Sequence, residues 1–193
     1  MSGLGVFGGQ FDPPHLGHLA AVRAARDQLD LDVLVVPDGL PPHRSPSQLP
    51  AATRVALARA AFAGEPRVTV RAPASPLRRT RTVELLEAVS GSRRLFLILG
   101  ADQWAGLEGW YRPDRIRELA TLVVAPRPGV SVDGEDIRLL AMPAVDVSST
   151  AVRDALSRGQ DVRGLVPEAV ADEIDRRRLY RAGPEPGAEP LLP

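Results

Sequence analysis

Histidine is scarce in this 193-residue chain, and its three copies, His15, His18 and His43, all lie in the first quarter. The imidazole group titrates near neutral pH and can donate or accept a hydrogen bond, so a clustered set favours chemistry. His15 and His18 stand three positions apart, which can place both rings on one side of a first helical turn. We interpret them as an anion-binding pair rather than a zinc site, since only His43 offers an obvious third ligand.

The pair closes a loop rich in glycine and proline, Gly8-Gly9-Gln10-Phe11-Asp12-Pro13-Pro14-His15-Leu16-Gly17-His18, which directly follows a short apolar run. The glycines allow backbone N–H groups to approach a ligand closely, and the prolines stiffen the loop. A helix is expected to begin near Gly17, with its unpaired N–H groups facing the end of the preceding strand, which is an anion site. The alternative is a capped surface loop carrying two histidines.

A second candidate for phosphate binding lies at Ser148-Ser149-Thr150, which are good residues to open a helix, with Arg153 one turn later. Their hydroxyls and N–H groups, together with a bidentate guanidinium contact, could hold a triphosphate. The alternative is an ordinary helix cap beside a surface arginine. All 24 basic residues are arginine, which excludes any mechanism that needs a lysine.

Three further residues follow predicted secondary structure in positions that suit a nucleotide. Asp102 comes after a buried strand and Gly100, where a carboxylate can accept ribose hydroxyls; the alternative is a capping aspartate. Trp110 could stack on a pyridinium ring or be partly buried in the core. Arg127 follows the next strand and faces either the nucleotide or solvent.

Composition narrows the function classes. The 24 acidic residues cancel the basic ones and the pI is about 6.9, which disfavours binding to a nucleic-acid backbone. The chain has no cysteine, and so has neither disulfides nor thiolate metal sites. No apolar run is long enough to suggest a membrane span and the N-terminus lacks a secretion signal, so we expect a cytoplasmic protein without membrane partners.

Short apolar runs alternate with helical periodicity along the chain. Strands are predicted at 4–7, 33–36, 68–70, 95–99, 122–125 and 137–142, and helices at 17–29, 51–62, 82–89, 115–119, 148–159 and 167–178. This alternation predicts an α/β fold, a Rossmann-like doubly wound parallel sheet with helices on both faces, which binds ligands at the carboxyl ends of its strands. Gly3-Leu4-Gly5-Val6-Phe7-Gly8 fits a dinucleotide fingerprint, but no strand can precede it. Residues 1–181 are expected to form one domain, and residues 182–193 a disordered tail.

The segment from Gly8 to His18 resembles the signature of the HxGH nucleotidyltransferase superfamily, whose Rossmann fold is like that of class I synthetases. Over about residues 5–181 the chain resembles bacterial nicotinate-nucleotide adenylyltransferases. Further segments carry this resemblance: Pro41-Pro42-His43-Arg44, Gly100-Ala101-Asp102, Leu107-Glu108-Gly109-Trp110-Tyr111, and Ser148-Ser149-Thr150-Ala151-Val152-Arg153. Three positions depart from the family pattern: Gln10 replaces Thr or Ser, Arg44 replaces Lys, and residues 79–82 keep only Thr82 of a Ser-Tyr-Thr segment.

The resemblance implies transfer of an adenylyl group from ATP to nicotinate mononucleotide, with Mg²⁺ carried by the ATP phosphates and no metal site on the protein. His15 and His18 are the implied catalytic residues. The implied ATP site adds the following residues: Gly8, Gly9, Gln10, Phe11, Gly100, Asp102, Arg127, Ser148, Ser149, Thr150 and Arg153. The implied mononucleotide site comprises Asp12, His43, Arg44, Thr82, Trp110 and Tyr111.

Other functions stay open at this point. The acceptor could instead be nicotinamide mononucleotide or another small phosphate of the same superfamily's substrates. A different class is a nucleotide-binding sensor without catalysis, to which Gln10 and the altered 79–82 segment lend some support. The sequence is compatible with a homo-oligomer but does not fix the oligomeric state.

Overall fold

A computed structural model describes residues 2–39, 49–73, 81–134, 136–143 and 145–181. These residues contain a six-stranded sheet in the order β3-β2-β1-β4-β5-β6, in which every pair of neighbours is parallel. The strands are β1 (Gly3–Gly9), β2 (Leu31–Pro37), β3 (Val68–Val70), β4 (Leu95–Gly100), β5 (Ala120–Ala125) and β6 (Ile137–Leu139). The predicted doubly wound parallel sheet is therefore confirmed.

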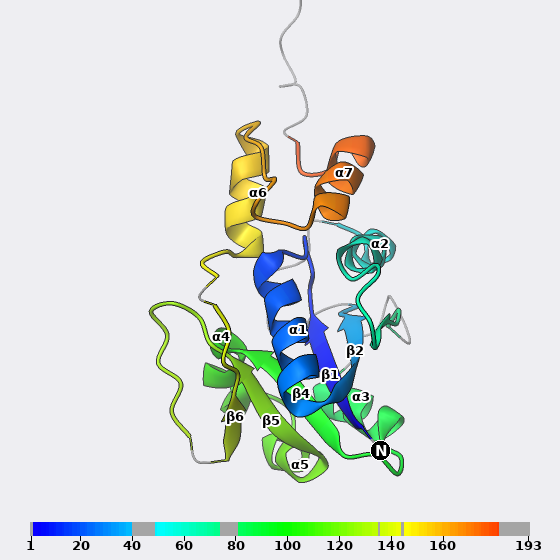
Figure 1. The fold of residues 1–193 in the computed structure, drawn as a ribbon, viewed down its shortest axis with the longest axis vertical. Coiled ribbons are helices and arrows are strands. Elements are labelled where there is room, and N and C mark those ends of the chain that lie inside the picture. The colour runs from blue at the N-terminus through cyan, green and yellow to red at the C-terminus, as the bar shows by residue number, and fades with distance from the viewer. Residues whose placement is uncertain (1, 40–48, 74–80, 135, 144, 182–193) are drawn as a thin grey trace, which may run out of the picture.

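Helices cover both faces of the sheet (Figure 1). They are α1 (Leu16–Leu29), α2 (Ala51–Ala61), α3 (Thr82–Val89), α4 (Ala101–Ala105), α5 (Pro113–Leu119), α6 (Ser149–Ser157) and α7 (Glu168–Arg177), with a 3₁₀ turn η1 at Leu107–Gly109. None of the helices in these described ranges has both the length and the apolar character needed to cross a membrane.

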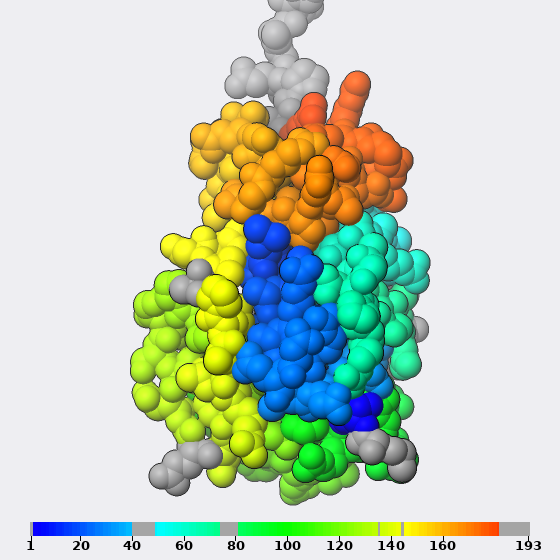
Figure 2. All heavy atoms as spheres, viewed as in Figure 1, coloured from blue at the N-terminus to red at the C-terminus, as the bar shows by residue number. Residues whose placement is uncertain are grey.

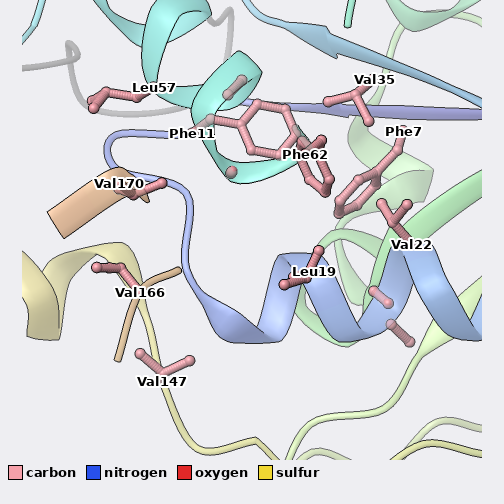
Figure 3. Packing of buried hydrophobic residues seen from close by; sticks show 14 of the residues in the cluster. Phe7, Phe11, Leu19, Val22, Val35, Leu57, Phe62, Val147, Val166 and Val170 are labelled. Atoms are coloured by element: carbon pink, nitrogen blue, oxygen red, sulfur yellow. The ribbon is translucent and has the colours of Figure 1, made fainter. Parts of the chain in front are cut away.

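The central strands are apolar on both sides because both sides are covered. In β1, Phe7 faces the main core cluster, which is formed with α1, α2, α6 and α7. Val6 faces the second core cluster, which is formed with α3 and α5. Such two-sided burial explains why these strands read as solid apolar runs and do not alternate. Phe7 packs edge-on against Phe11 at a centroid distance of 5.5 Å, and Phe11 packs against Phe62 (Figure 3).

The last two helices stand beyond the sheet, above the N-terminal end of α1 and next to α2 (Figure 1). In the space-filling view, this segment covers the start of α1 from above (Figure 2). The backbone N–H of Leu16, the first residue of α1, donates to the carbonyl of Leu165 at 2.9 Å. The C-terminal part of the described chain therefore closes over the carboxyl end of β1.

The sequence predictions are wrong in some details. They contained neither α4 nor η1, because five and three residues are too few to show a helical period. The strand predicted at 137–142 ends at Leu139, and β5 begins two residues earlier than predicted. His43, Arg44 and the predicted tail at 182–193 lie outside the described residues.

Candidate functional site

A cavity opens at the carboxyl edge of the sheet, next to β1 and β4. After β1 the chain adds β2 and β3 on one side of that strand, and it then returns to add β4 on the other side. The strand order therefore reverses between β1 and β4. Open α/β sheets bind their ligands at such a reversal. Six of the residues predicted from sequence line this cavity: His15, His18, Gly100, Asp102, Arg127 and Ser148. Residues from distant parts of the sequence therefore meet at one place.

The two histidines form a stacked pair at the start of α1. Their ring centroids lie 3.6 Å apart with an interplanar angle of 28°. The Nδ1 atom of His18 accepts a hydrogen bond from the backbone N–H of His15 at 3.1 Å. Because Nδ1 is an acceptor, the proton of a neutral His18 ring lies on Nε2, which is then a donor.

His15 is held in a state that disfavours a positive charge. Burial, reinforced by the positive guanidinium of Arg127, lowers the pKa of His15 to about 4. Its Nδ1 atom is buried and has no hydrogen-bond partner among the described residues. An unsatisfied buried polar atom is costly, so this position of the His15 ring is unfavourable for stability.

The absence of a side chain at Gly17 leaves room for the ring of His15. A Cβ built on Gly17 would lie 3.1 Å from both Cε1 and Nδ1 of the His15 ring. That is closer than ordinary van der Waals contact, so with a larger residue the His15 ring would have to shift by a few tenths of an ångström. The glycine therefore allows His15 to fold back over the first turn of the helix.

The start of α6 is bonded to the loop between β1 and α1. The hydroxyl of Ser148 caps the helix by accepting from the N–H of Ala151 at 3.1 Å. Ser149 donates to the carbonyl of Pro13 at 2.8 Å. Arg153 donates to the carbonyl of Asp12 at 2.8 Å and to the hydroxyl of Thr150 at 3.1 Å. The predicted phosphate-binding segment at the start of α6 thus lies against the predicted phosphate-binding loop between β1 and α1.

The far side of the cavity is lined by an ion pair and an amide. The guanidinium of Arg127 donates to the carboxylate of Asp102 at 2.5 Å, so Arg127 turns toward the cavity. Gln103 accepts from the N–H of Gly100 at 3.0 Å and approaches the carbonyl of Gly8 at 3.5 Å. Gln103 was missed in the sequence, although it directly follows the Gly-Ala-Asp segment.

Those of the remaining predicted residues that the structure describes do not line this cavity. Phe11 and Asp12 are only 1% and 2% exposed, so neither residue presents a surface to a nucleotide in this structure. Trp110 is partly buried and packs against the cluster of α3 and α5. Tyr111 is half exposed, with the guanidinium of Arg81 4.0 Å from its ring centroid. Thr82 is the first residue of α3.

Two more residues contact this region and were not among the predicted site residues. Arg54 in α2 is 1% exposed and donates to the carbonyls of Gln10, Asp38 and Gly39. Tyr180 donates to the carboxylate of Asp12 at 2.6 Å. A signal for Arg54 was available, because it shares a helical face with the apolar Leu57, Ala58 and Ala61.

Comparisons with known proteins agree with this geometry. Residues 6–155 match the cytidylyltransferase-like family model. A probable nicotinate-nucleotide adenylyltransferase of Laribacter hongkongensis is 38% identical over 93% of this chain and 94% of its own length. The protein of the same name from Thermus thermophilus is 38% identical over 92% of this chain and 99% of its own.

This chain belongs to the nicotinate-nucleotide adenylyltransferase family. Solved structures agree at the level of the fold. Plasmodium falciparum nicotinic acid mononucleotide adenylyltransferase complexed with NaAD superposes with a TM-score of 0.77, at 16% identity over 93% of this chain and 98% of the other. The same enzyme complexed with APC gives a TM-score of 0.76 over the same shares of the two chains. The family's fold and the predicted resemblance are therefore confirmed.

Proposed function

We propose that this chain transfers the adenylyl group of ATP to nicotinate mononucleotide, giving nicotinate adenine dinucleotide and pyrophosphate. The observation that carries the proposal is the stacked His15–His18 pair at the start of α1, in a cavity at the reversal of strand order. The relatives' names supply the acceptor, since they are nicotinate-nucleotide adenylyltransferases over nearly the whole chain.

The reaction needs no nucleophilic side chain. An oxygen of the mononucleotide's 5′-phosphate attacks the α-phosphorus of ATP, and the bond from that phosphorus to the bridging β-phosphate oxygen breaks as pyrophosphate leaves. The protein's part is positioning and stabilisation of negative charge, as in other phosphoryl transfers. The Nε2–H of His18 donates to a phosphate oxygen, and the His15 ring lines the cavity beside it.

The two helix starts complete the proposed phosphate site. The first turns of α1 and α6 lie close together and carry the partial positive charge of a helix N-terminus. Gly8, Gly9 and Gln10 offer backbone at the end of β1, while Ser149, Thr150 and Arg153 lie beside the loop that follows. Asp102 then takes the ribose of ATP, and Arg127 balances the triphosphate charge.

The mononucleotide is proposed to bind beyond the cavity. Trp110 and Tyr111 would face the pyridine ring, with Thr82 beside it, and His43 and Arg44 would approach the acceptor phosphate. Phe11 and Asp12 act through the packing of the loop, because both residues are buried.

Magnesium enters the proposal with the substrate. Within the part of the chain that the structure describes, no three His, Asp or Glu side chains are grouped so that they could hold a metal ion. Mg²⁺ bound to the phosphates of ATP neutralises part of their charge, and the protein contributes only the arginines and imidazoles around them.

A pyrophosphate-release assay tests the function. The enzyme is mixed with ATP and Mg²⁺, and with nicotinate mononucleotide, nicotinamide mononucleotide or 4′-phosphopantetheine as acceptor. We expect release with the nicotinate compound and a much lower kcat/KM with the amide, because donors that bind a carboxylate would be left unpaired. Preference for the amide or for phosphopantetheine would change the acceptor, and release with none of the three would favour a nucleotide-binding sensor.

A further inference from the structure

The buried side chain of Arg54 forms a hydrogen bond to the loop between β1 and α1. The Arg54 guanidinium donates to the carbonyl of Gln10 at 2.7 Å, and to those of Asp38 and Gly39 at 2.6 and 2.8 Å. Its Nε atom donates to the carbonyl of Leu49 at 3.2 Å. One side chain thus fixes the ends of two neighbouring strands, which are also joined by the bond from the N–H of Asp38 to the carbonyl of Gly9 at 2.8 Å.

The charge of Arg54 is balanced within the same region. Burial lowers the pKa of Arg54, and the carboxylates of Asp12 and Asp38 oppose that shift. A guanidinium stays charged even so, because its ordinary pKa is far above neutral. Burying a charge is costly unless it is paired and hydrogen-bonded, and Arg54 meets this condition only while the loop carbonyls and the two carboxylates stay in place around it.

Tyr180 holds the loop from the opposite side. Its hydroxyl donates to Oδ1 of Asp12 at 2.6 Å, and its ring packs against the main core cluster. Burial, and then the bond to Asp12, raise the pKa of Tyr180, so the hydroxyl remains a donor. Tyr180 has a φ of +60° and Phe11 a φ of +50°, a left-handed conformation that is unfavourable for aromatic residues.

From these contacts, we infer that Arg54, Asp12 and Tyr180 form a buried network that positions the loop from Gln10 to His15 for adenylyl transfer. The inference rests on the proposed function and assigns new roles within it. None of the three side chains needs to touch a substrate: Arg54 and Tyr180 act through the loop. The short segment after α7 is thereby a working part of the site, although Tyr180 lies 168 positions from Asp12 in the sequence.

Tyr180→Phe is the decisive variant, because it removes a single hydroxyl and leaves the ring in the core. Arg54→Lys is the second variant, since a lysine keeps the charge but cannot reach carbonyls in three separate segments. Arg26→Lys is the matched control. Arg26 is also largely buried and bonds to Asp27, Glu65 and the carbonyl of Pro66, but it lies at the opposite end of α1.

Three quantities are measured on the parent and the variants: melting temperature, kcat and KM for pyrophosphate release, and amide hydrogen exchange in a peptide covering residues 8–15. We expect Tyr180→Phe and Arg54→Lys to lower kcat about tenfold or more, with smaller changes in either KM, and to speed exchange in this peptide. Arg26→Lys is expected to lower the melting temperature while keeping the parental kcat and loop exchange.

Parental exchange of the loop in Tyr180→Phe would overturn the inference, as would faster exchange with a parental kcat. Equal losses of kcat in the Arg26 control would also overturn it, because they would trace the effect to general stability. If Arg54→Lys does not fold, Tyr180→Phe decides alone. If the parent releases no pyrophosphate, the proposed function fails, and loop exchange still decides whether the network holds the loop.

Discussion

The two halves of the proposed substrate site are built differently. The phosphate half is fixed by hydrogen bonds from three distant parts of the chain: Arg54 from α2, Ser149 and Arg153 from α6, and Tyr180 after α7. In the pyridine half, Tyr111 is half exposed. Thr82 is the first residue of α3, and Trp110 directly follows the 3₁₀ turn η1.

This difference separates reaction from acceptor choice. Charge stabilisation requires groups that are already in place when charge develops, and a loop bonded on all sides supplies that. In the proposed site, recognition of the pyridine ring would depend instead on a few side chains near the surface. Thr82, where the segment that departs from the family pattern ends, belongs to this second half of the proposed site, and changes there would alter the acceptor without disturbing the phosphate half.

The largest effect is expected in the phosphate half. His18→Ala should fold normally but lose about 3–4 kcal/mol of transition-state stabilisation, roughly a hundred- to thousandfold in kcat, because a preorganised donor is removed. Turnover measured by pyrophosphate release, beside circular dichroism of the variant, checks this. Activity within threefold of the parent would contradict the assigned role.

The buried state of His15 should appear in the pH dependence of stability. Its pKa is about 4 in the folded chain and about 6.5 when exposed, so the unfolded chain binds more protons between these values. Folding stability should therefore fall as pH drops from about 6.5 toward 4, by on the order of 3 kcal/mol from this group. Urea unfolding of the parent and of His15→Gln across this range tests it. Parallel losses in both would show that other groups cause the pH dependence.

Gly17→Ala sharpens the comparison by separating activity from stability. Alanine is the better helix former by about 1 kcal/mol, yet its Cβ would displace the His15 ring. We expect kcat to fall about tenfold to a hundredfold while the melting temperature stays level or rises. Full activity would mean that the ring can move without consequence.

The smallest effect is expected in the pyridine half. Trp110→Ala should raise KM for the mononucleotide about tenfold through loss of ring stacking, and leave KM for ATP within about twofold. The variant will also lose stability, because Trp110 packs against the second core cluster, so both constants should be measured well below its melting temperature. Equal increases in the two KM values would assign Trp110 to structure alone and would remove the distinction between the halves.

The sequence by itself determined the class of fold and the phosphate loop. The sequence predicted all six strands, and solid apolar runs mark the inner strands β2, β1, β4 and β5 because both of their faces are covered. The motif that contains His15, Gly17 and His18 is local in the sequence, so it could be read without the fold. Gly17 can be understood only with the preceding ring beside it, but the motif already specified both residues.

Only the tertiary structure decided how that loop is held. Asp12 and Tyr180 are 168 positions apart, and no periodicity connects them. Arg54 binds backbone carbonyls, which every residue has, so its partners leave no trace in residue types. Local patterns report which face of a strand or helix is buried, whereas the pairing of distant polar groups follows from how the folded elements pack.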